Sequence, residues 1–175
     1  AAITEGFGKA SPSPVPPMSA NYTDVQAKYL AYDVEKAKAL LEEAGYNGGE
    51  ITILATRRNG AYYERALMAQ AMMMDAGINA RLEVVEWGSQ LEAYRNGSGY
   101  QMQSFTFSPR LHAGLSFEMF TGDADRKAWK NPEAVAMMNE SLRMGDPEEL
   151  QAIIDRLHEA FIEEVPAIGL GHRTL

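Results

Sequence analysis

The sequence predicts an α/β fold in which a mixed, mostly parallel sheet is flanked by helices. Two short β-rich runs, residues 51–56 and 81–86, are separated by a helical pattern over residues 62–76. This order is that of a βαβ unit, whose crossover is right-handed and whose strands are parallel. The chain has 175 residues, 46% of them hydrophobic, which is enough to bury a core and too apolar for a disordered chain.

The first 31 residues are expected to be irregular. Residues 11–17 contain prolines at alternating and adjacent positions, and proline lacks the N–H donor and restricts the residue before it. Two interpretations remain open for this segment: a flexible tag or linker, or an ordered segment that packs on another part of a larger protein.

The first helix is predicted over residues 33–44. Asp33 is placed to cap its N-terminus, and Gly45 is placed to end it in the left-handed conformation. An apolar stripe at i, i+3, i+4 and i+7 starts at Ala37 and predicts the buried face. In the helix over residues 62–76, the corresponding side carries Leu67, Ala71 and Met74.

The stretch from residue 80 to residue 117 organises the chain. Strand 81–86 is followed by Trp87, a short helix that stops at Gly97, and a second strand over residues 100–107. Residues 108–114 then break all periodicity. In open α/β sheets, ligands bind beyond the carboxyl ends of the strands. The functional site is therefore predicted at Trp87 and at the loop after Phe107.

The C-terminal third is predicted to hold two helices and a last strand. Pro132 opens the first helix, whose apolar face carries Val135, Met138 and Leu142. The second helix starts at Asp146-Pro147 and covers residues 147–164. Residues 165–170 are expected to form a fourth strand beside 51–56, 81–86 and 101–107. The stripe of the second helix consists of Leu150, Ile153, Ile154, Leu157 and Phe161.

The composition excludes several classes of protein. The formal net charge is −8, which argues against a nucleic-acid partner, because phosphates require a basic surface. No apolar run approaches the roughly 20 residues that span a bilayer. Cysteine is absent, which excludes disulfides and thiolate metal sites.

The residues also indicate no catalytic centre, cofactor site or metal site. The three histidines, His112, His158 and His172, lack the i, i+4 spacing of zinc helices, and His158 is expected at the surface or at the boundary of the core. No phosphate-binding glycine motif is present. The loop over residues 121–127 is charged, but the glycine and the terminal glutamate of a calcium-binding EF-hand loop are not in register.

Three stretches carry a family resemblance. They are YDVEKAKALLEEAGY at residues 32–46, AGIN at 76–79 followed by LEVVEW at 82–87, and VPAI at 165–168. With these motifs the chain resembles the C-terminal lobe of the family 5 extracytoplasmic solute-binding proteins, the peptide, opine and nickel receptors of ABC importers. The resemblance implies a periplasmic-binding-protein-like type II lobe.

The resemblance further implies the setting in which such a lobe works. The chain would be a fragment of a larger two-lobed periplasmic receptor, with residues 1–31 as an ordered crossing segment and residues 32–175 as the ligand-binding lobe. Its partners would be a small-molecule solute, the ABC permease subunits at the membrane and the missing N-terminal lobe of the same receptor. The receptor would be a monomer, not an enzyme, and would use no cofactor.

The resemblance also assigns candidate ligand-binding residues. Trp87 occupies the position of a tryptophan that lines the cavity of oligopeptide-binding relatives, and Phe107 matches a second cleft tryptophan. Ser104 aligns with an arginine of peptide-binding relatives. Arg110 aligns with the aspartate that pairs with a peptide's α-amino group, so a free N-terminus should be repelled and an anionic solute favoured.

Two further arginines extend this set. Arg57 and Arg58 leave strand 51–56 at its carboxyl end, in the same direction as Arg110. They are expected either to bind the solute or simply to solvate the loop. Arg110 is expected to anchor the solute or to latch the two lobes together.

Two other functions stay open at this point. One is a small α/β hydrolase or transferase that uses Glu86 or His112. The other is a receptor lobe that only docks protein partners. The residues do not identify the solute, whether peptide-like, opine-like or another anionic compound.

Overall fold

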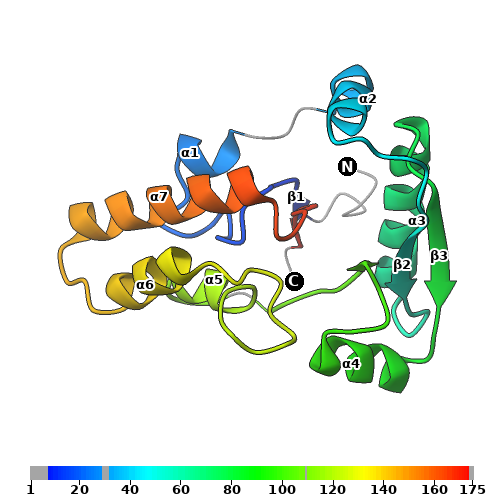
Figure 1. The fold of residues 1–175 in the computed structure, drawn as a ribbon. Coiled ribbons are helices and arrows are strands. Elements are labelled where there is room, and N and C mark those ends of the chain that lie inside the picture. Colours follow the sequence, from blue (N-terminus) through cyan, green and yellow to red (C-terminus); the bar gives the residue numbers. More distant parts are fainter. Residues whose placement is uncertain (1–7, 29–31, 109, 174–175) are drawn as a thin grey trace. The chain divides into compact units, whose positions relative to one another are not determined.

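The computed structural model describes residues 8–28, 32–108 and 110–173. Part of the predicted crossing segment and Pro109 of the loop after Phe107 lie outside these residues. In chain order the elements are β1 (Gly8–Lys9), α1 (Asp24–Ala27), α2 (Val34–Glu43), β2 (Ile51–Ala55), α3 (Gly60–Asp75), β3 (Ala80–Val84), α4 (Trp87–Asn96), β4 (Met102–Gln103), α5 (Leu115–Glu118), α6 (Pro132–Ser141), α7 (Pro147–Glu164) and β5 (His172–Arg173) (Figure 1).

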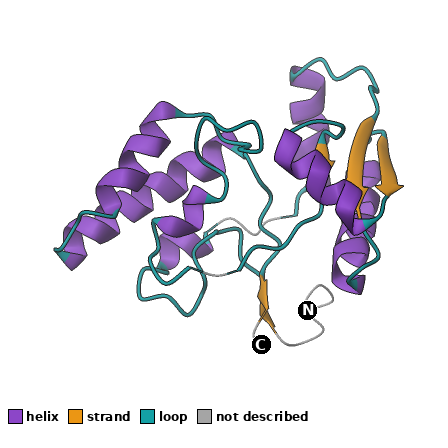
Figure 2. Cartoon of the chain, turned by 90° about the horizontal axis from the view of Figure 1, so that it is seen from below, coloured by secondary structure: helices purple, strands orange, loops and turns teal. Residues whose placement is uncertain are grey.

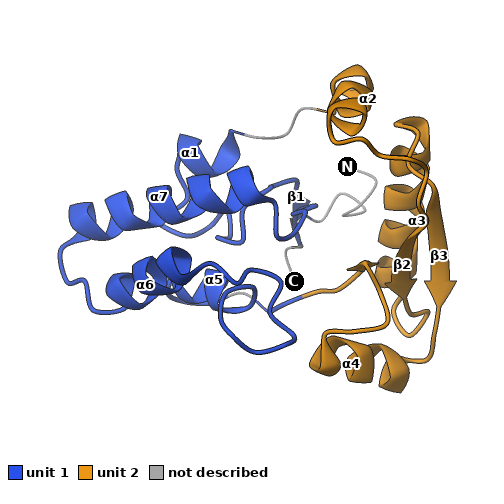
Figure 3. Cartoon of the chain, in the orientation of Figure 1, with its two compact units in different colours: residues 1–30, 107–175 blue, residues 31–106 orange. Residues whose placement is uncertain are grey.

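The chain folds into two compact units (Figure 3). Unit 1 combines Ala1–Leu30 with Phe107–Leu175, and unit 2 is Ala31–Thr106. The sequence predicts that residues 32–175 form one lobe of a longer, two-lobed receptor, and this stays a prediction. Within this chain, the residues after 106 group with the N-terminal segment.

Unit 2 contains the predicted βαβ arrangement. Its three strands form a parallel sheet in the order β3–β2–β4. The register pairs Ile51 with Ala80 and Ile53 with Met102. Helix α3 packs on this sheet, and the core between them centres on Ile53, Ala55, Ala66 and Ala80. Asp33 caps α2 and Gly97 ends α4 in the left-handed conformation, as predicted. Helix α3 starts at Gly60, two residues earlier than predicted, because the Asn59 side chain caps it.

Two predicted strands of unit 2 are shorter than expected. Strand β3 ends at Val84 rather than at residue 86, and β4 contains only Met102–Gln103 of the predicted 100–107. The N–H of Ser104 still donates to the Leu54 carbonyl at 2.9 Å. Beyond it, the chain leaves the sheet because the Phe105 ring packs among other aromatic rings.

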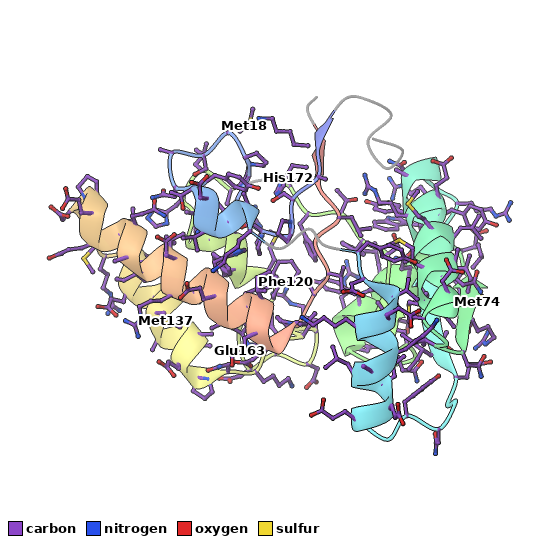
Figure 4. The ribbon with its side chains drawn as sticks, turned by 90° about the horizontal axis from the view of Figure 1, so that it is seen from above. Met18, Met74, Phe120, Met137, Glu163 and His172 are labelled. Atoms are coloured by element: carbon purple, nitrogen blue, oxygen red, sulfur yellow. The ribbon has the colours of Figure 1, made fainter. Side chains whose placement is uncertain are left out.

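The predicted buried faces of α2 and α3 were wrong. Leu40 is 53% exposed, Leu67 47% and Met74 58%, and Figure 4 shows the Met74 side chain on α3. Helix α3 instead turns Ala66 and Met73 towards the sheet. The buried alanine allows the helix backbone to approach the strands closely, while Leu67 and Met74 lie outside this contact.

Unit 1 is mainly helical (Figure 2). Asp146 caps α7 as expected, and four residues of the predicted stripe of this helix are buried in the core that it shares with α6. Helix α7 therefore belongs to unit 1, whereas we had predicted that it flanks the parallel sheet. Among the described residues, no helix has both the length and the apolar character needed to cross a membrane. The core of unit 1 consists of Val15, Ala113, Phe117, Trp129, Ala134, Met137, Met138, Ile153, Ile154, Leu157 and Phe161.

The proline-rich segment is an ordered part of unit 1. Ser11 and Val15 are fully buried, and Val15 belongs to the same core as α7. The serine hydroxyls accept hydrogen bonds from the backbone N–H groups that lie between the prolines: the Ser13 N–H donates to Ser11 Oγ at 3.2 Å, and the Val15 N–H donates to Ser13 Oγ at 3.0 Å. The interpretation as a flexible tag is therefore wrong for these residues.

The predicted fourth strand over residues 165–170 is absent from the described part of the chain. Helix α7 ends at Val165, whose φ of 47° turns the backbone into the left-handed region. The chain then lies against the N-terminal segment, and β5 pairs with β1 as an antiparallel two-stranded sheet. Gly169 permits this close approach, because a Cβ there would overlap the carbonyl group of Pro12.

Candidate functional site

A pocket of about 430 Å³ lies at the carboxyl edge of the parallel sheet in unit 2. Its walls come from the residues that follow β2 and from the end of β3, and the arrowheads of both strands point towards α4 (Figure 1). This is the edge at which open α/β sheets bind ligands, as the sequence predicts. The lining residues are Thr56, Arg57, Arg58, Val84, Val85 and Glu86.

Aromatic rings gather beside this pocket. Trp87 is half-buried; its ring centroid lies 5.7 Å from that of Tyr62 and 5.6 Å from that of Phe105. Tyr62 and Phe105 are 6.2 Å apart, so the three centroids form a nearly equilateral triangle. Tyr62 and Phe105 therefore do not sandwich the indole between them. Tyr94 extends the cluster, with its ring 5.0 Å from Phe105.

The two arginines of the pocket lie on aromatic rings. The guanidinium carbon of Arg58 is 5.0 Å from the Trp87 ring centroid, and that of Arg57 is 4.3 Å from the Tyr63 ring centroid. Each contact contributes about 0.5–1 kcal/mol at an exposed site. Within the described parts of the chain, neither guanidinium forms an ion pair with a carboxylate. The rings thus hold the position of both cations without neutralising them.

A buried glutamine fixes the backbone next to the aromatic cluster. Gln90, one helical turn after Trp87 on α4, is fully buried, and its Nε2 donates to the Ser104 carbonyl at 2.7 Å. Because the Ser104 N–H donates to Leu54, its backbone links α4 to the sheet. Arg65 on α3 adds a hydrogen bond from Nη1 to Thr106 Oγ1 at 2.8 Å. These bonds hold the segment that carries Phe105.

The structure brings together only part of the predicted site. Arg57, Arg58 and Trp87 meet at the pocket, and Ser104 contributes its backbone nearby. The sequence reasoning missed the rings around Trp87. Tyr62 could have been inferred from its place in the first turn of the helix that follows the arginine loop.

The other two predicted residues, Phe107 and Arg110, belong to unit 1. The half-buried Phe107 ring packs edge-to-face on Phe120 at 5.4 Å, and Phe120 packs on Phe161 of the core. Arg110 is exposed. The pKa of Glu118 is lowered mainly by the hydrogen bond that it accepts from Lys127, and the charge of Arg110 is a minor cause in the same direction.

The charged loop over residues 121–127 ends at a buried cation, Lys127. Lys127 is only 6% exposed, and its Nζ donates to the carbonyl oxygen of Glu118 and, at 2.9 Å, to Glu118 Oε1. Within residues 8–28, 32–108 and 110–173, no three side chains of the types His, Cys, Asp or Glu group as metal ligands.

The two residues considered for a hydrolase, Glu86 and His112, lie in different units. Glu86 belongs to unit 2, where it precedes α4. His112 belongs to unit 1, and its Nδ1 accepts a hydrogen bond from the Gly114 N–H at 3.2 Å. In the part of the chain that the structure describes, no serine or threonine hydroxyl is hydrogen-bonded to a histidine ring.

Comparison with known proteins gives consistent matches. Residues 1–126 match the family model of the bacterial extracellular solute-binding proteins, family 5 middle. The chain is 28% identical, over 97% of its length, to di/tripeptide-binding protein 4 of Pseudomonas aeruginosa. It is 34% identical to the dipeptide-binding protein of Escherichia coli over 55% of its length, which is 19% of that protein.

Solved structures agree with these matches. The chain superimposes on the periplasmic binding protein AgaA of A. tumefaciens, solved with agropinic acid, with a TM-score of 0.84 and 24% identity, over 97% of this chain and 36% of that one. It superimposes on DppA of Helicobacter pylori, solved with the peptide STSA, with a TM-score of 0.82 and 25% identity, over 97% of this chain and 34% of that one. The chain spans 34% of the length of the Pseudomonas relative.

Proposed function

This chain belongs to the family 5 bacterial extracellular solute-binding proteins, and we propose that it captures a small solute outside the cytoplasm for an ABC importer. The observation that carries this proposal is the pocket at the carboxyl edge of unit 2, with its aromatic cluster and its two arginines. Small-molecule sites typically combine apolar and aromatic walls with a few polar groups that orient the ligand. The names of the relatives, which refer to peptides and heme, support a solute of similar size.

The proposed mechanism is closure of two lobes around the solute. This chain would supply one wall, and an N-terminal lobe of the same receptor would supply the other. The closed receptor, a monomer in the periplasm, would then dock on the permease subunits at the membrane. No bond is made or broken, so the protein would be no enzyme, and it would need neither a catalytic residue nor a cofactor.

Six residues are proposed to contact the solute. Trp87 and Phe107 would form apolar walls, since both side chains are half-buried and keep surface to offer. Ser104 would contribute a polar contact. The remaining three, Arg57, Arg58 and Arg110, would favour a peptide-like, opine-like or other anionic compound.

A thermal-shift screen of the full-length receptor tests the proposal. Di- and tripeptides, opines, sugars and sugar phosphates would each be added at increasing concentration. A solute at about 100 times its dissociation constant stabilises the folded state by about 2.7 kcal/mol, and this raises the melting temperature.

A pair of variants links any such shift to the pocket. Trp87→Ala should reduce the shift, whereas Tyr32→Ala, which removes an exposed aromatic ring elsewhere in unit 2, should leave it unchanged. Hydrolysis or transfer of a solute by the purified receptor would contradict the proposal, as would the absence of binding across the whole panel.

A further inference from the structure

Three Asn-Gly pairs occur in the sequence, and all of them belong to unit 2. They are Asn47-Gly48, Asn59-Gly60 and Asn96-Gly97. Asparagine is a thermolabile residue, and a following glycine has no side chain to hinder attack of its backbone nitrogen on the asparagine amide. All three asparagines are exposed, so exposure does not distinguish them. The hydrogen bonds around each pair do.

Two of the pairs are held by helix ends. Asn59 caps α3, and its Oδ1 accepts a hydrogen bond from the Ala61 N–H at 3.0 Å. Asn96 is the last residue of α4, and the N–H of Gly97 donates to carbonyl groups in the last turn of that helix. In the first pair the amide that would be attacked is engaged, and in the second pair the attacking nitrogen is engaged. Reaction at either pair therefore has to wait for local opening of a helix end.

Asn47 lies in the loop between α2 and β2 and has no such protection. Among the described residues, neither its side chain nor the Gly48 N–H has a hydrogen-bond partner. A Cβ built on Gly49 would lie 3.7 Å from Asn47 Oδ1, so the Asn47 side chain lies along the backbone that follows it. A Cβ on Gly48 would meet nothing within 4 Å, so the space around the attacking nitrogen is open.

We propose that Asn47 is a site of spontaneous deamidation, at which the Gly48 backbone nitrogen displaces ammonia from the side-chain amide. The nitrogen gives its proton to solvent and bonds to Asn47 Cγ, and ammonia leaves, so that a five-membered succinimide forms. Water then opens the ring at either carbonyl carbon. One product is aspartate, and the other is isoaspartate, in which the side-chain carboxyl carbon has become part of the main chain. Both products carry a carboxylate in place of a neutral amide.

The surroundings of Asn47 predict what the isoaspartate does to the fold. The Tyr46 hydroxyl donates to the Gly49 carbonyl and accepts from the Asn79 N–H at 3.0 Å. Asn79 Nδ2 donates to the Gly48 carbonyl at 3.1 Å. These bonds tie the loop before β2 to the loop before β3, and an isoaspartate lengthens the main chain in the middle of them, which moves the Gly48 carbonyl away from its donor. They lie at the amino ends of the two strands, whereas the pocket lies at the carboxyl ends, so the inference is independent of the proposed function.

Peptide mapping of the aged full-length receptor tests the site. The receptor would be incubated in slightly alkaline buffer, where the attacking nitrogen loses its proton more readily, and samples would be digested and analysed by mass spectrometry. Methylation by an isoaspartyl methyltransferase would detect the isoaspartate. Asn47 should react about 10-fold or more faster than Asn59 and Asn96, because those two require local opening. Equal rates at the three pairs, or a slower rate at Asn47, overturn the proposal.

The same incubation in urea separates the effect of the fold from that of the flanking residues. In the unfolded receptor all three pairs lose their folded surroundings, and their rates should lie within about 3-fold of one another. If Asn47 keeps the same lead in urea, its neighbours in the sequence determine the order and the structural argument falls.

Two variants separate the added charge from the altered main chain. Asn47→Asp carries the carboxylate on a normal main chain and should melt within about 2 °C of the fresh wild type, because the site is exposed. Wild type that has accumulated isoaspartate at this position should melt several degrees lower. Asn47→Gln, whose longer side chain closes a ring much more slowly, is aged alongside as the control for changes elsewhere and should keep its melting temperature. Aged wild type that contains the isoaspartate and still melts like Asn47→Gln would overturn the predicted effect on the fold.

Discussion

His158 is fully buried on α7, although we had expected it at the surface or at the boundary of the core. Neither of its ring nitrogens has a hydrogen-bond partner among the described residues. Burial lowers the pKa of His158 to about 4, against an opposing effect of the nearby Asp155 carboxylate. The imidazole is therefore neutral in the folded protein at neutral pH, and protonation favours the unfolded chain.

This difference predicts a loss of stability in weak acid. The unfolded histidine titrates near 6.5 and the folded one near 4, so the unfolded chain binds more protons between these values. Stability is retained above pH 6.5 and falls as the pH drops towards 4. Urea unfolding should show a free energy of unfolding about 2 kcal/mol lower at pH 5 than at pH 7 from this residue.

A variant that cannot titrate is the control for this prediction. His158→Leu replaces the ring with an apolar side chain of similar size and should flatten the dependence between pH 7 and pH 5. An equally steep dependence in His158→Leu would assign the effect to other groups. The pKa of Glu118 is also lowered, but this carboxylate acts only below its ordinary value of 4.5, outside the window.

Arg110 allows a second prediction at the residue scale. If it anchors an anionic solute, Arg110→Ala should weaken binding by roughly 30-fold or more, because removing a desolvated charged partner costs about 2–5 kcal/mol. If it latches two lobes instead, every ligand should lose affinity alike. Calorimetry of wild type and Arg110→Ala with one charged and one neutral ligand distinguishes these cases. Equal losses for both ligands would refute the anchor.

The sequence predicted the strand end at which Arg57 and Arg58 lie but not the contacts that their side chains make. The place of Arg57 and Arg58 after a strand predicts the edge at which they lie, because the ends of parallel strands meet there. The partners of these cations, Tyr63 and Trp87, follow from the angle between α3, α4 and the sheet, which no local pattern encodes. The burial of His158 is equally a property of tertiary packing.

At the scale of elements, the sequence predicted where helices begin and end better than which side they bury. Asp33, Asp146 and Gly97 act locally, through hydrogen bonds or backbone conformation within one turn, and all three were read correctly. Which side of α3 is buried depends on how closely the helix approaches the sheet. The small side chain of Ala66 lies in that contact, and Leu67 stays largely exposed. The length of strand β4 also depends on tertiary packing: Phe105 packs on Trp87 and does not pair with the neighbouring strand.

The contact between residues 8–13 and 169–173 gives a prediction for these elements. Gly169→Ala should lower the free energy of unfolding by about 1–3 kcal/mol, because its Cβ would force the backbone at Pro12 to move. Gly145→Ala is a matched control, since a Cβ there meets nothing within 4 Å. Urea unfolding of both variants measures the difference. Equal stabilities would mean that the two segments separate at little cost.

At the scale of the whole molecule, the sequence predicted the α/β class but not the division into two units. Residues 107–175 follow unit 2 in the chain without any linker composition, and yet they build a core with Val15. This core joins segments about a hundred residues apart, and hydrophobic periodicity shows only that each segment has an apolar side. The partner of that side is decided by packing over the whole chain.

The two cores predict two separable unfolding transitions. Trp129 lies in the core of unit 1 and Trp87 lies in unit 2, so variants with a single tryptophan report on one unit each. Phe161→Ala should destabilise unit 1 by about 3–5 kcal/mol through the cavity it leaves. Urea unfolding followed through Trp129 should shift accordingly, whereas the Trp87 signal should not. A common shift of both signals would show that the units unfold as one.

The pairing of β1 with β5 also decides how the chain responds to mechanical load. The strands are antiparallel, with Gly8 opposite Arg173 and Lys9 opposite His172, so the outer ends of both strands lie at the same end of the ribbon. A force applied along the chain from these two ends pulls across the strands and loads one residue pair at a time. Peeling in this geometry requires little force, in contrast to shearing, in which all pairs resist together. Tension would therefore open this ribbon before it reaches the helical core of unit 1, and the close contact of Gly169 with Pro12 would be the next point to resist.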